Sequence, residues 1–381
     1  MPMAADDDFG ARLRAAAPDL LVEAAAEHLR EWHGVDAADV LLADYRISGL
    51  WPVLDAHDDD PIGGNLRDRG ASARCFAGQQ PVIEGRRVFL PLTAWGERVG
   101  VLVLDGDRLD LDRLAENADE LAVALRAADR DTDRYRLARR RERLTMAAEM
   151  QWDLLPGRSL SHPRFELAGQ LEPAYTVAGD HFDWAVTDEK LTLTVMNGSG
   201  TGLAASALSN LAVNAMRNAR RSGGDIVEQA ELASDTVFAH YGGDRHVATL
   251  LLEADLATGR VSAVDAGSPH AFRIRGATLS PITLDQQLPL GMFGEAQYST
   301  QGFMLEPGDR LFIVSDGVHA AAPGTRQAFG QAAMITAIRA TRLQPPAEAV
   351  GSVMRGLQDY HEDADPDDDA VIVCLDWHGV D

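Results

Sequence analysis

Short apolar runs bounded by turn residues recur through the second half of the chain and predict β-strands. Two long segments between them, Leu203–Arg220 and Ile226–His240, read as helices, and a third helix is predicted near Pro346–Tyr360. The predicted strands are Thr192–Met196, Ala248–Glu253, Arg260–Ala266, Ala271–Ile274, Arg310–Val314 and Ala370–Leu375. This order of strands and helices fits a mostly antiparallel sandwich flanked by helices better than regular βαβ units.

The first third of the chain has a different pattern, which predicts a smaller α+β module. Helical periodicity covers Leu13–Trp32, and a second amphipathic helix is predicted at Leu109–Ala128. Between them, the β-runs Arg87–Thr93 and Arg98–Leu104 flank a short turn that contains glycine, which is typical of a hairpin. We therefore assign a separate module to residues 15–128.

Residues 129–157 are predicted to form a helical linker between the two parts. The segment Asp129–Gln151 is strongly charged and contains no Gly or Pro, and a Pro-Gly pair follows it. Leu137, Leu144 and Gln151 are seven residues apart. This spacing favours one continuous helix and indicates a short dimeric coiled coil, so we expect a homodimer.

Length and charge narrow the class of protein. A chain of 381 residues has room for two domains, and its formal net charge of −24 would repel nucleic acids and anionic membranes. Residues 1–14 are acidic, are expected to be a disordered tail and lack the basic and apolar segments of a signal peptide. No apolar stretch reaches the roughly 18 residues of a membrane span. We therefore predict a cytoplasmic protein.

Polar turns at the ends of predicted strands carry the candidate chemistry. Asp180, Asp316 and the run Asp367–Asp369 supply carboxylates, whereas Asn197 supplies an amide. An aspartate before glycine is a good turn residue on its own, so any single turn is weak evidence. Antiparallel strands can bring distant turns to one end of a sheet pair, and oxygen ligands suit Mg²⁺ and Mn²⁺. Together the turns predict a divalent-cation site that handles phosphate.

Hydrolysis of a phosphate ester requires strong charge stabilisation. Two metal ions about 4 Å apart can activate a water and clamp the phosphate oxygens, provided that carboxylates bridge them. Three carboxylates and one amide would hold such a pair less tightly than four carboxylates.

The ordered motifs VAGDHFDW, TVMNGSGTGLAAS, LEPGDRLFIVSDGV and DDDAVIV resemble those of the PPM-type (PP2C-like) phosphatases of the bacterial sporulation and stress-response branch. The resemblance implies an α/β/β/α sandwich over residues 158–381 that binds Mn²⁺ or Mg²⁺. It also implies action on Ser or Thr of a phosphorylated anti-anti-sigma-factor-like protein. Residues 15–128 resemble GAF sensor domains, which implies a sensor for a small-molecule ligand or a dimerisation scaffold. No ligand residues are assigned there.

The resemblance also implies roles for individual residues. Asp180, Asp316 and Asp368 stand at the metal-binding aspartates that hold the water nucleophile. The remaining metal positions are Asn197, the main-chain oxygen of Gly198, and Asp369, which shares the final aspartate pair with Asp368. These six residues form the predicted site.

The chain departs from the family pattern at its most important position. Asn197 replaces the aspartate that normally bridges both metals, and an amide oxygen ligates without a full charge. Asp265–Ser268 replaces the usual Asn-Ala-Gly-His segment, and Ala320 stands where a Glu commonly follows the DG turn. Two functions therefore stay open: an active protein phosphatase, or a weak or dead pseudophosphatase that acts as a signalling or binding module.

Overall fold

The computed structural model describes residues 8–54, 64–141, 143–172, 177–267, 269–319, 330–361 and 368–379. The chain divides into two compact units, Met1–Arg143 and Leu144–Asp381, here called the N-terminal and C-terminal units. Among the described residues, no helix has both the length and the apolar character needed to cross a membrane.

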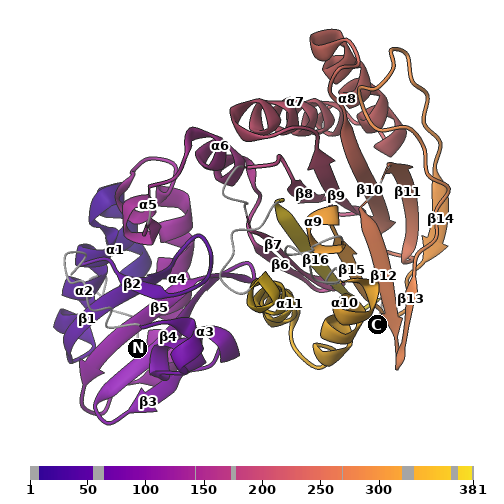
Figure 1. The fold of residues 1–381 in the computed structure, drawn as a ribbon. Coiled ribbons are helices and arrows are strands. Elements are labelled where there is room, and N and C mark those ends of the chain that lie inside the picture. The colour runs from indigo at the N-terminus through magenta and orange to yellow at the C-terminus, as the bar shows by residue number, and fades with distance from the viewer. Residues whose placement is uncertain are drawn as a thin grey trace. The chain divides into compact units, whose positions relative to one another are not determined.

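The N-terminal unit is built on one antiparallel sheet with the strand order β2-β1-β5-β4-β3 (Figure 1). Its elements, in chain order, are α1 (Phe9–Ala15), η1 (Pro18–Leu20), α2 (Leu21–Trp32), β1 (Val35–Ala43), β2 (Leu50–Pro52), η2 (Leu66–Asp68), α3 (Ala71–Gly78), β3 (Val82–Glu84), β4 (Arg87–Ala94), β5 (Glu97–Gly106), α4 (Leu111–Ala128) and α5 (Arg134–Arg139).

The predicted hairpin is present as β4 and β5. Trp95 and Gly96 form its two-residue turn, and both have positive φ, as the tight hairpin turns that match strand twist require. One face of the sheet packs against α1, α2 and α4, and the other face packs against α3. The unit is thus an α+β module; its likeness to GAF domains stays a prediction.

The acidic start of the chain is not wholly a disordered tail. Residues 1–7 lie outside the described residues, but α1 begins at Phe9, directly after Asp8, whose side chain accepts a hydrogen bond from the Ala11 amide. Phe9 and Leu13 are buried in the core of the unit. The disorder expected over residues 1–14 is therefore wrong for the helix, because two apolar side chains one turn apart fix it to the sheet.

The predicted continuous linker helix is also wrong. Helix α4 ends at Ala128, α5 spans only Arg134–Arg139, and the next helix, α6 (Met146–Leu154), belongs to the C-terminal unit. Tyr135 holds α5 in place, because its buried hydroxyl donates to Pro18 O at 2.8 Å. Tertiary contacts of this kind override the helical propensity of a charged segment.

The three heptad positions consequently have different environments. The Leu137 side chain is exposed, whereas Gln151 lies buried inside the C-terminal unit. They do not share a stripe on one helix, so the predicted homodimer loses its basis in the coiled-coil pattern and stays a prediction.

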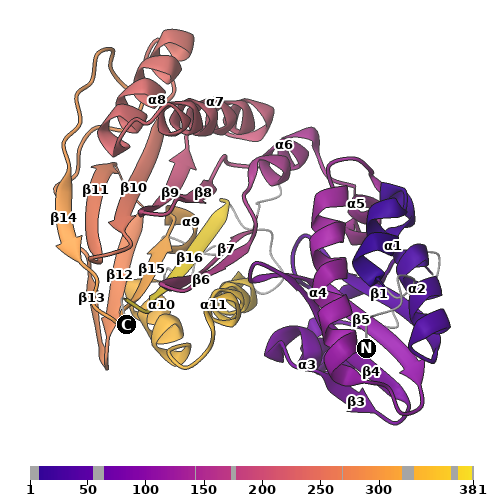
Figure 2. The same ribbon diagram turned by 180° about the vertical axis from the view of Figure 1, so that it is seen from behind.

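The C-terminal unit is a sandwich of two antiparallel sheets between two layers of helices (Figures 1 and 2). The sheets have the orders β14-β11-β10-β9-β8 and β13-β12-β15-β16-β7-β6. The elements after α6 are β6 (Ser159–His162), β7 (Phe165–Glu172), β8 (His181–Val186), β9 (Lys190–Gly198), α7 (Gly202–Arg221), α8 (Ile226–Tyr241), β10 (Val247–Asp255), β11 (Arg260–Ala266), β12 (His270–Arg275), β13 (Thr278–Pro281), β14 (Gln301–Met304), β15 (Arg310–Val314), α9 (Asp316–His319), α10 (Gly330–Ala340), α11 (Pro346–His361) and β16 (Ala370–Trp377).

Strand β16 shows how the layers are filled. Successive side chains of a strand point to opposite faces, so Val371 and Val373 enter the core between the two sheets. Ile372 and Cys374 pack instead against α10 and α11 on the outer face. Helices α7 and α8 cover the outer face of the other sheet. The α/β/β/α sandwich predicted from the sequence is confirmed.

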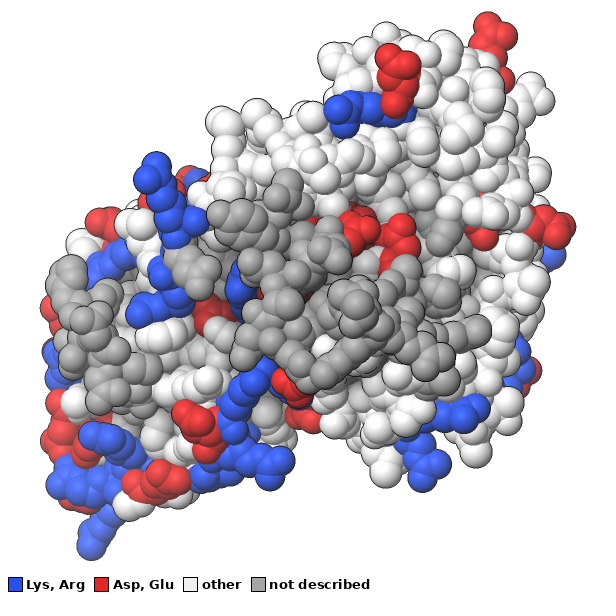
Figure 3. Space-filling model, in the orientation of Figure 1, with Lys and Arg blue, Asp and Glu red and all other residues white. Residues whose placement is uncertain are grey.

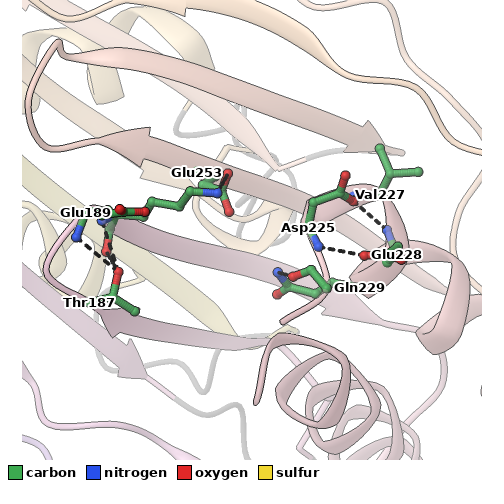
Figure 4. A network of polar contacts seen from close by, with 9 residues as sticks. Thr187, Glu189, Asp225, Val227, Glu228, Gln229 and Glu253 are labelled. Carbon is green, nitrogen blue, oxygen red and sulfur yellow. Dashed lines mark hydrogen bonds and ion pairs between the residues drawn. The ribbon is translucent and has the colours of Figure 1, made fainter. Parts of the chain in front are cut away.

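Local signals fix the ends of these elements. Asp225 caps α8 by accepting from the Val227 and Glu228 amides, while Glu228 accepts from the Asp225 amide in return, which is a capping box (Figure 4). Lys190 on β9 pairs with Glu253 on β10, with 3.0 Å between Nζ and Oε1. The capping box fixes the start of α8, and the ion pair joins two neighbouring strands of the sheet.

Candidate metal centre

Two of the predicted site residues lie at one end of the neighbouring strands β8 and β9, in the sheet β14-β11-β10-β9-β8. Asp180 immediately precedes β8, and Asn197 is the second-last residue of β9. The register pairs His181 with Met196, which sets the two polar residues at the same sheet end. Only 1% of Asp180 and 9% of Asn197 is exposed.

The other predicted residues come from the second sheet. Asp316 directly follows Ser315 at the end of β15, and Asp368 and Asp369 immediately precede β16. These two turns are in close contact, because a Cβ on Gly317 would lie 1.8 Å from the backbone oxygen of Asp369. A glycine is therefore required after Asp316 for the end of β15 to lie beside the start of β16.

Asp369 joins the two sheets. Its Oδ2 accepts from the Gly179 amide at 2.9 Å and from the Asp180 amide at 3.3 Å. The Asp369 side chain is fully buried. The four polar turns therefore meet at one end of the sandwich, and Figure 3 shows acidic side chains gathered on this face of the unit.

The charges of these turns act on one another. Burial raises the pKa of the Asp180 carboxyl well above its usual value. The negative charges of Asp316, Asp369 and Asp368 raise it further, in that order. A hydrogen bond from Ser315 has the opposite effect. Carboxylates that destabilise one another in this way are stabilised by a cation placed among them.

Two buried oxygen atoms at this sheet end have no donor among the residues that the structure describes. They are Asp180 Oδ2 and Asn197 Oδ1. A buried acceptor without a donor is costly, and both atoms are hard oxygen ligands of the kind that Mg²⁺ or Mn²⁺ prefers. The donor set fits a divalent cation. No group of three or more His, Cys, Asp or Glu among the described residues has ligand geometry already formed.

The structure separates the tasks of the last aspartate pair. Asp369 is committed to the backbone of the Gly179–Asp180 turn, whereas Asp368 is partly exposed and accepts from the Asp369 amide at 2.9 Å. Asp368 is therefore the better candidate for a metal ligand, and Asp369 a positioning residue. Its predicted share in metal binding is not favoured by this geometry.

Sequence reasoning missed Gln151, which it treated only as a heptad position. Gln151 Nε2 donates to the backbone oxygen of Asp180 at 2.6 Å and to Asp369 Oδ2 at 2.7 Å. Helix α6 therefore contacts the candidate site directly. No local signal marks this role, because a single glutamine in a charged segment resembles any solvated helix residue.

Glycines allow the loops to approach closely. A Cβ on Gly198 would lie 2.8 Å from the backbone oxygen of Gly179. Ser209 on α7 donates to that same oxygen. Ala320 and Ser268, two departures from the family pattern, lie outside the described residues, so the structure does not place them.

Comparisons with known proteins agree with this architecture. Two similar solved structures are the RsbU and RsbW domains of Rv1364c from Mycobacterium tuberculosis and the PP2C phosphatase domain with a regulatory fragment of SpoIIE from Bacillus subtilis. Each is 18% identical with a TM-score of 0.50; the first match covers 57% of this chain, the second 56%, and each covers 63% of the other protein. The chain thus spans less than two thirds of either, and the likeness concerns the fold.

A comparison with curated protein sequences gives no significant match. The decisive similarity is at the level of the family: residues 187–378, half of the chain, match Stage II sporulation protein E (SpoIIE). The similar SpoIIE structure is a PP2C phosphatase domain. The protein therefore belongs to the SpoIIE family of PP2C-type phosphatases.

Proposed function

We propose that this chain is a metal-dependent protein serine/threonine phosphatase that acts on a phosphorylated regulator of the anti-anti-sigma-factor type. The observation that carries the proposal is the meeting of Asp180, Asp316 and Asp368 with the Asn197–Gly198 loop at one end of the sandwich. One similar structure contains RsbU and RsbW domains in the same protein, which supports a partner from a regulatory system of this kind.

The residues would divide the work as follows. The carboxylates of Asp180, Asp316 and Asp368, with the side-chain oxygen of Asn197 and the main-chain oxygen of Gly198, would hold the cation. A bound Mn²⁺ or Mg²⁺ supplies an activated water and charge neutralisation at the phosphoryl oxygens.

Gln151 and Asp369 orient the Asp180 turn, since both form hydrogen bonds with its backbone.

Action on a regulator of the anti-anti-sigma-factor type implies a cytoplasmic protein. The N-terminal unit would act as the sensor, with a small molecule as its ligand.

The test is phosphate release from p-nitrophenyl phosphate and from a phosphorylated anti-anti-sigma protein in the presence of Mn²⁺. We expect release by the full-length protein and a loss of at least about 100-fold in Asp316→Ala, because a ligand contributes more than the groups that merely orient it. Equal rates for the two proteins would remove the proposal.

One observation favours a second function, that of a pseudophosphatase which captures phosphoproteins without hydrolysis. Asn197 occupies its sheet end next to Asp180 with an uncharged oxygen, so the chain lacks the bridging carboxylate. Under this function the unmodified protein binds no Mn²⁺ in calorimetry, and Asn197→Asp gains affinity and activity. If the protein binds Mn²⁺ tightly and Asn197→Asp adds less than about twofold, the second function is contradicted.

A further inference from the structure

The loop after Asn197 has an arginine beside it that forms no ion pair with a carboxylate of the described residues. Arg245 precedes β10, and its Nη1 lies 3.4 Å from the backbone oxygen of Ser199. In the described part of the chain, this long hydrogen bond is the one polar contact of its guanidinium, and no ion pair includes it. In a chain with a net charge of −24, an unpaired and partly buried arginine is unusual.

The fold holds Arg245 at the candidate site through two strands. Ala248 on β10 pairs with Asn197, and Val247 pairs with Gly198. The ladder continues beyond the strands, since the Ser199 amide donates to the His246 backbone oxygen at 3.2 Å. The Ser199 hydroxyl accepts from the His246 amide at 3.1 Å. The residue before His246 therefore lies against the loop that begins at Asn197.

Gly200 makes room for the guanidinium. Its φ is +95°, and a Cβ there would lie 2.3 Å from Arg245 Nη1. Any other residue at this position would displace the arginine side chain. The glycine thus lets the guanidinium lie directly against this loop.

A phosphorylated substrate needs such a cation. A dianionic phosphoryl group at this site would lie near three carboxylates, which repel it. The amide of Asn197 adds no negative charge that would help to bind a second metal ion. A guanidinium presents several N–H donors in a planar fork that matches phosphate oxygens, and these charge-assisted hydrogen bonds are strong. Helix α7 begins at Gly202, at the end of the same loop, so its dipole adds positive potential there.

We propose that Arg245 binds the phosphoryl group of the substrate, on the side of the site next to Asn197. This inference rests on the proposed function insofar as it takes the acidic turns to be the phosphate-handling site. It adds a substrate-binding residue from the segment before β10, outside the set of metal ligands.

The test is calorimetric binding of inorganic phosphate to the full-length protein in the presence of Mg²⁺. Arg245→Gln should weaken phosphate binding by about tenfold or more. Arg245→Lys keeps the charge but loses the planar fork of donors, so its phosphate affinity should lie between those of Arg245→Gln and the wild type. Arg260→Gln is the matched control, because Arg260 is an exposed arginine at the far end of the neighbouring strand β11. Its phosphate affinity should equal that of the wild type.

Two further measurements separate this role from a structural one. The Mg²⁺ affinity and the melting temperature of Arg245→Gln should equal those of the wild type, since Arg245 contacts no candidate ligand side chain. For p-nitrophenyl phosphate hydrolysis, KM should rise more than kcat falls.

The inference is overturned if the wild type binds no phosphate, or if Arg245→Gln binds it as well as the wild type does. Its failure is distinct from that of the proposed function: an active enzyme that is insensitive to Arg245→Gln removes only the inference. A protein that binds phosphate through Arg245 but releases none removes only the proposed hydrolysis.

Discussion

Asp368 and Asp369 are adjacent in the sequence, yet their side chains have different tasks. Asp369 is fully buried, and its Oδ2 accepts from two backbone amides of the Asp180 turn and from Gln151. Asp368 is partly exposed at the edge of the site. The stability of the fold should therefore depend on Asp369, and metal binding should depend on Asp368.

Asp369→Ala should lower the free energy of unfolding of the C-terminal unit by about 2–4 kcal/mol, because it leaves several buried donors without an acceptor. Asp368→Ala should change it by less than about 1 kcal/mol but weaken Mn²⁺ binding. Differential scanning calorimetry measures the first effect, and titration with Mn²⁺ the second. Equal melting temperatures of the two variants would contradict this division of tasks.

The residues that supply candidate ligands could be predicted from the sequence, but the residues that contact and position them could not. Asp180, Asp316 and Asp368 follow from turn chemistry next to apolar runs, and the structure brings their turns together. Gln151, Ser315 and Arg245 were not identified, since each acts through a contact with residues distant in sequence. Such contacts leave no local pattern.

At the scale of elements, a buried ion pair fixes α7 to β8. Arg217 Nη2 lies 2.7 Å from Asp183 Oδ1, and Arg220 Nη2 lies 3.1 Å from Asp183 Oδ2. Burial alone would raise the pKa of Asp183, but the hydrogen bonds and charge of Arg217, together with Arg220, outweigh it, so the pKa is lowered. Arg217 also donates to the Leu154 backbone oxygen at 2.8 Å, which includes the end of α6 in the network.

Asp183→Asn should lower the free energy of unfolding by roughly 3 kcal/mol at neutral pH, because it leaves two partly buried arginines unpaired. The unfolded-state pKa of an aspartate is about 3.9, and the folded-state value is lower. The contribution of Asp183 is thus fully present above pH of about 4 and is lost as the pH falls through the folded pKa.

The difference between variant and wild type should therefore shrink in acid, as measured by thermal unfolding between pH 7 and pH 3. Lys190→Met is the control, because the surface pair of Lys190 with Glu253 is worth about 0.5 kcal/mol or less. A pH-independent difference for Asp183→Asn would refute this account of the pair.

Elements with strong periodicity were predicted well, and those defined by tertiary contacts were not. The hairpin of β4 and β5 and the buried strand β16 are evident as apolar runs. Helix α1 was not predicted, because it lies in an acidic segment and only Phe9 and Leu13 anchor it in the core. The break between α5 and α6 arises because Tyr135 forms its hydrogen bond within the N-terminal unit, whereas Gln151 forms its hydrogen bonds within the C-terminal unit. Helical propensity does not encode such contacts.

At the scale of the whole molecule, each unit has its own cores. Those of the N-terminal unit use residues up to Ala138, and those of the C-terminal unit begin at Leu144. The chain accordingly divides into compact units at Arg143 and Leu144, and the domain bounds assigned from the sequence stay predictions. The sandwich brings turns from both sheets to one end. Because the four turns meet there, they form a candidate metal centre.

Anomalous X-ray diffraction from crystals of the full-length protein soaked in Mn²⁺ would show directly whether these four turns bind a cation. We expect at least one Mn²⁺ peak within ligand distance of Asp180 Oδ2, with Asp316 or Asp368 among its neighbours, and an additional or stronger peak in Asn197→Asp. No peak at this end of the sandwich, in a crystal where Mn²⁺ binds elsewhere, would contradict the claim that these turns form a metal centre.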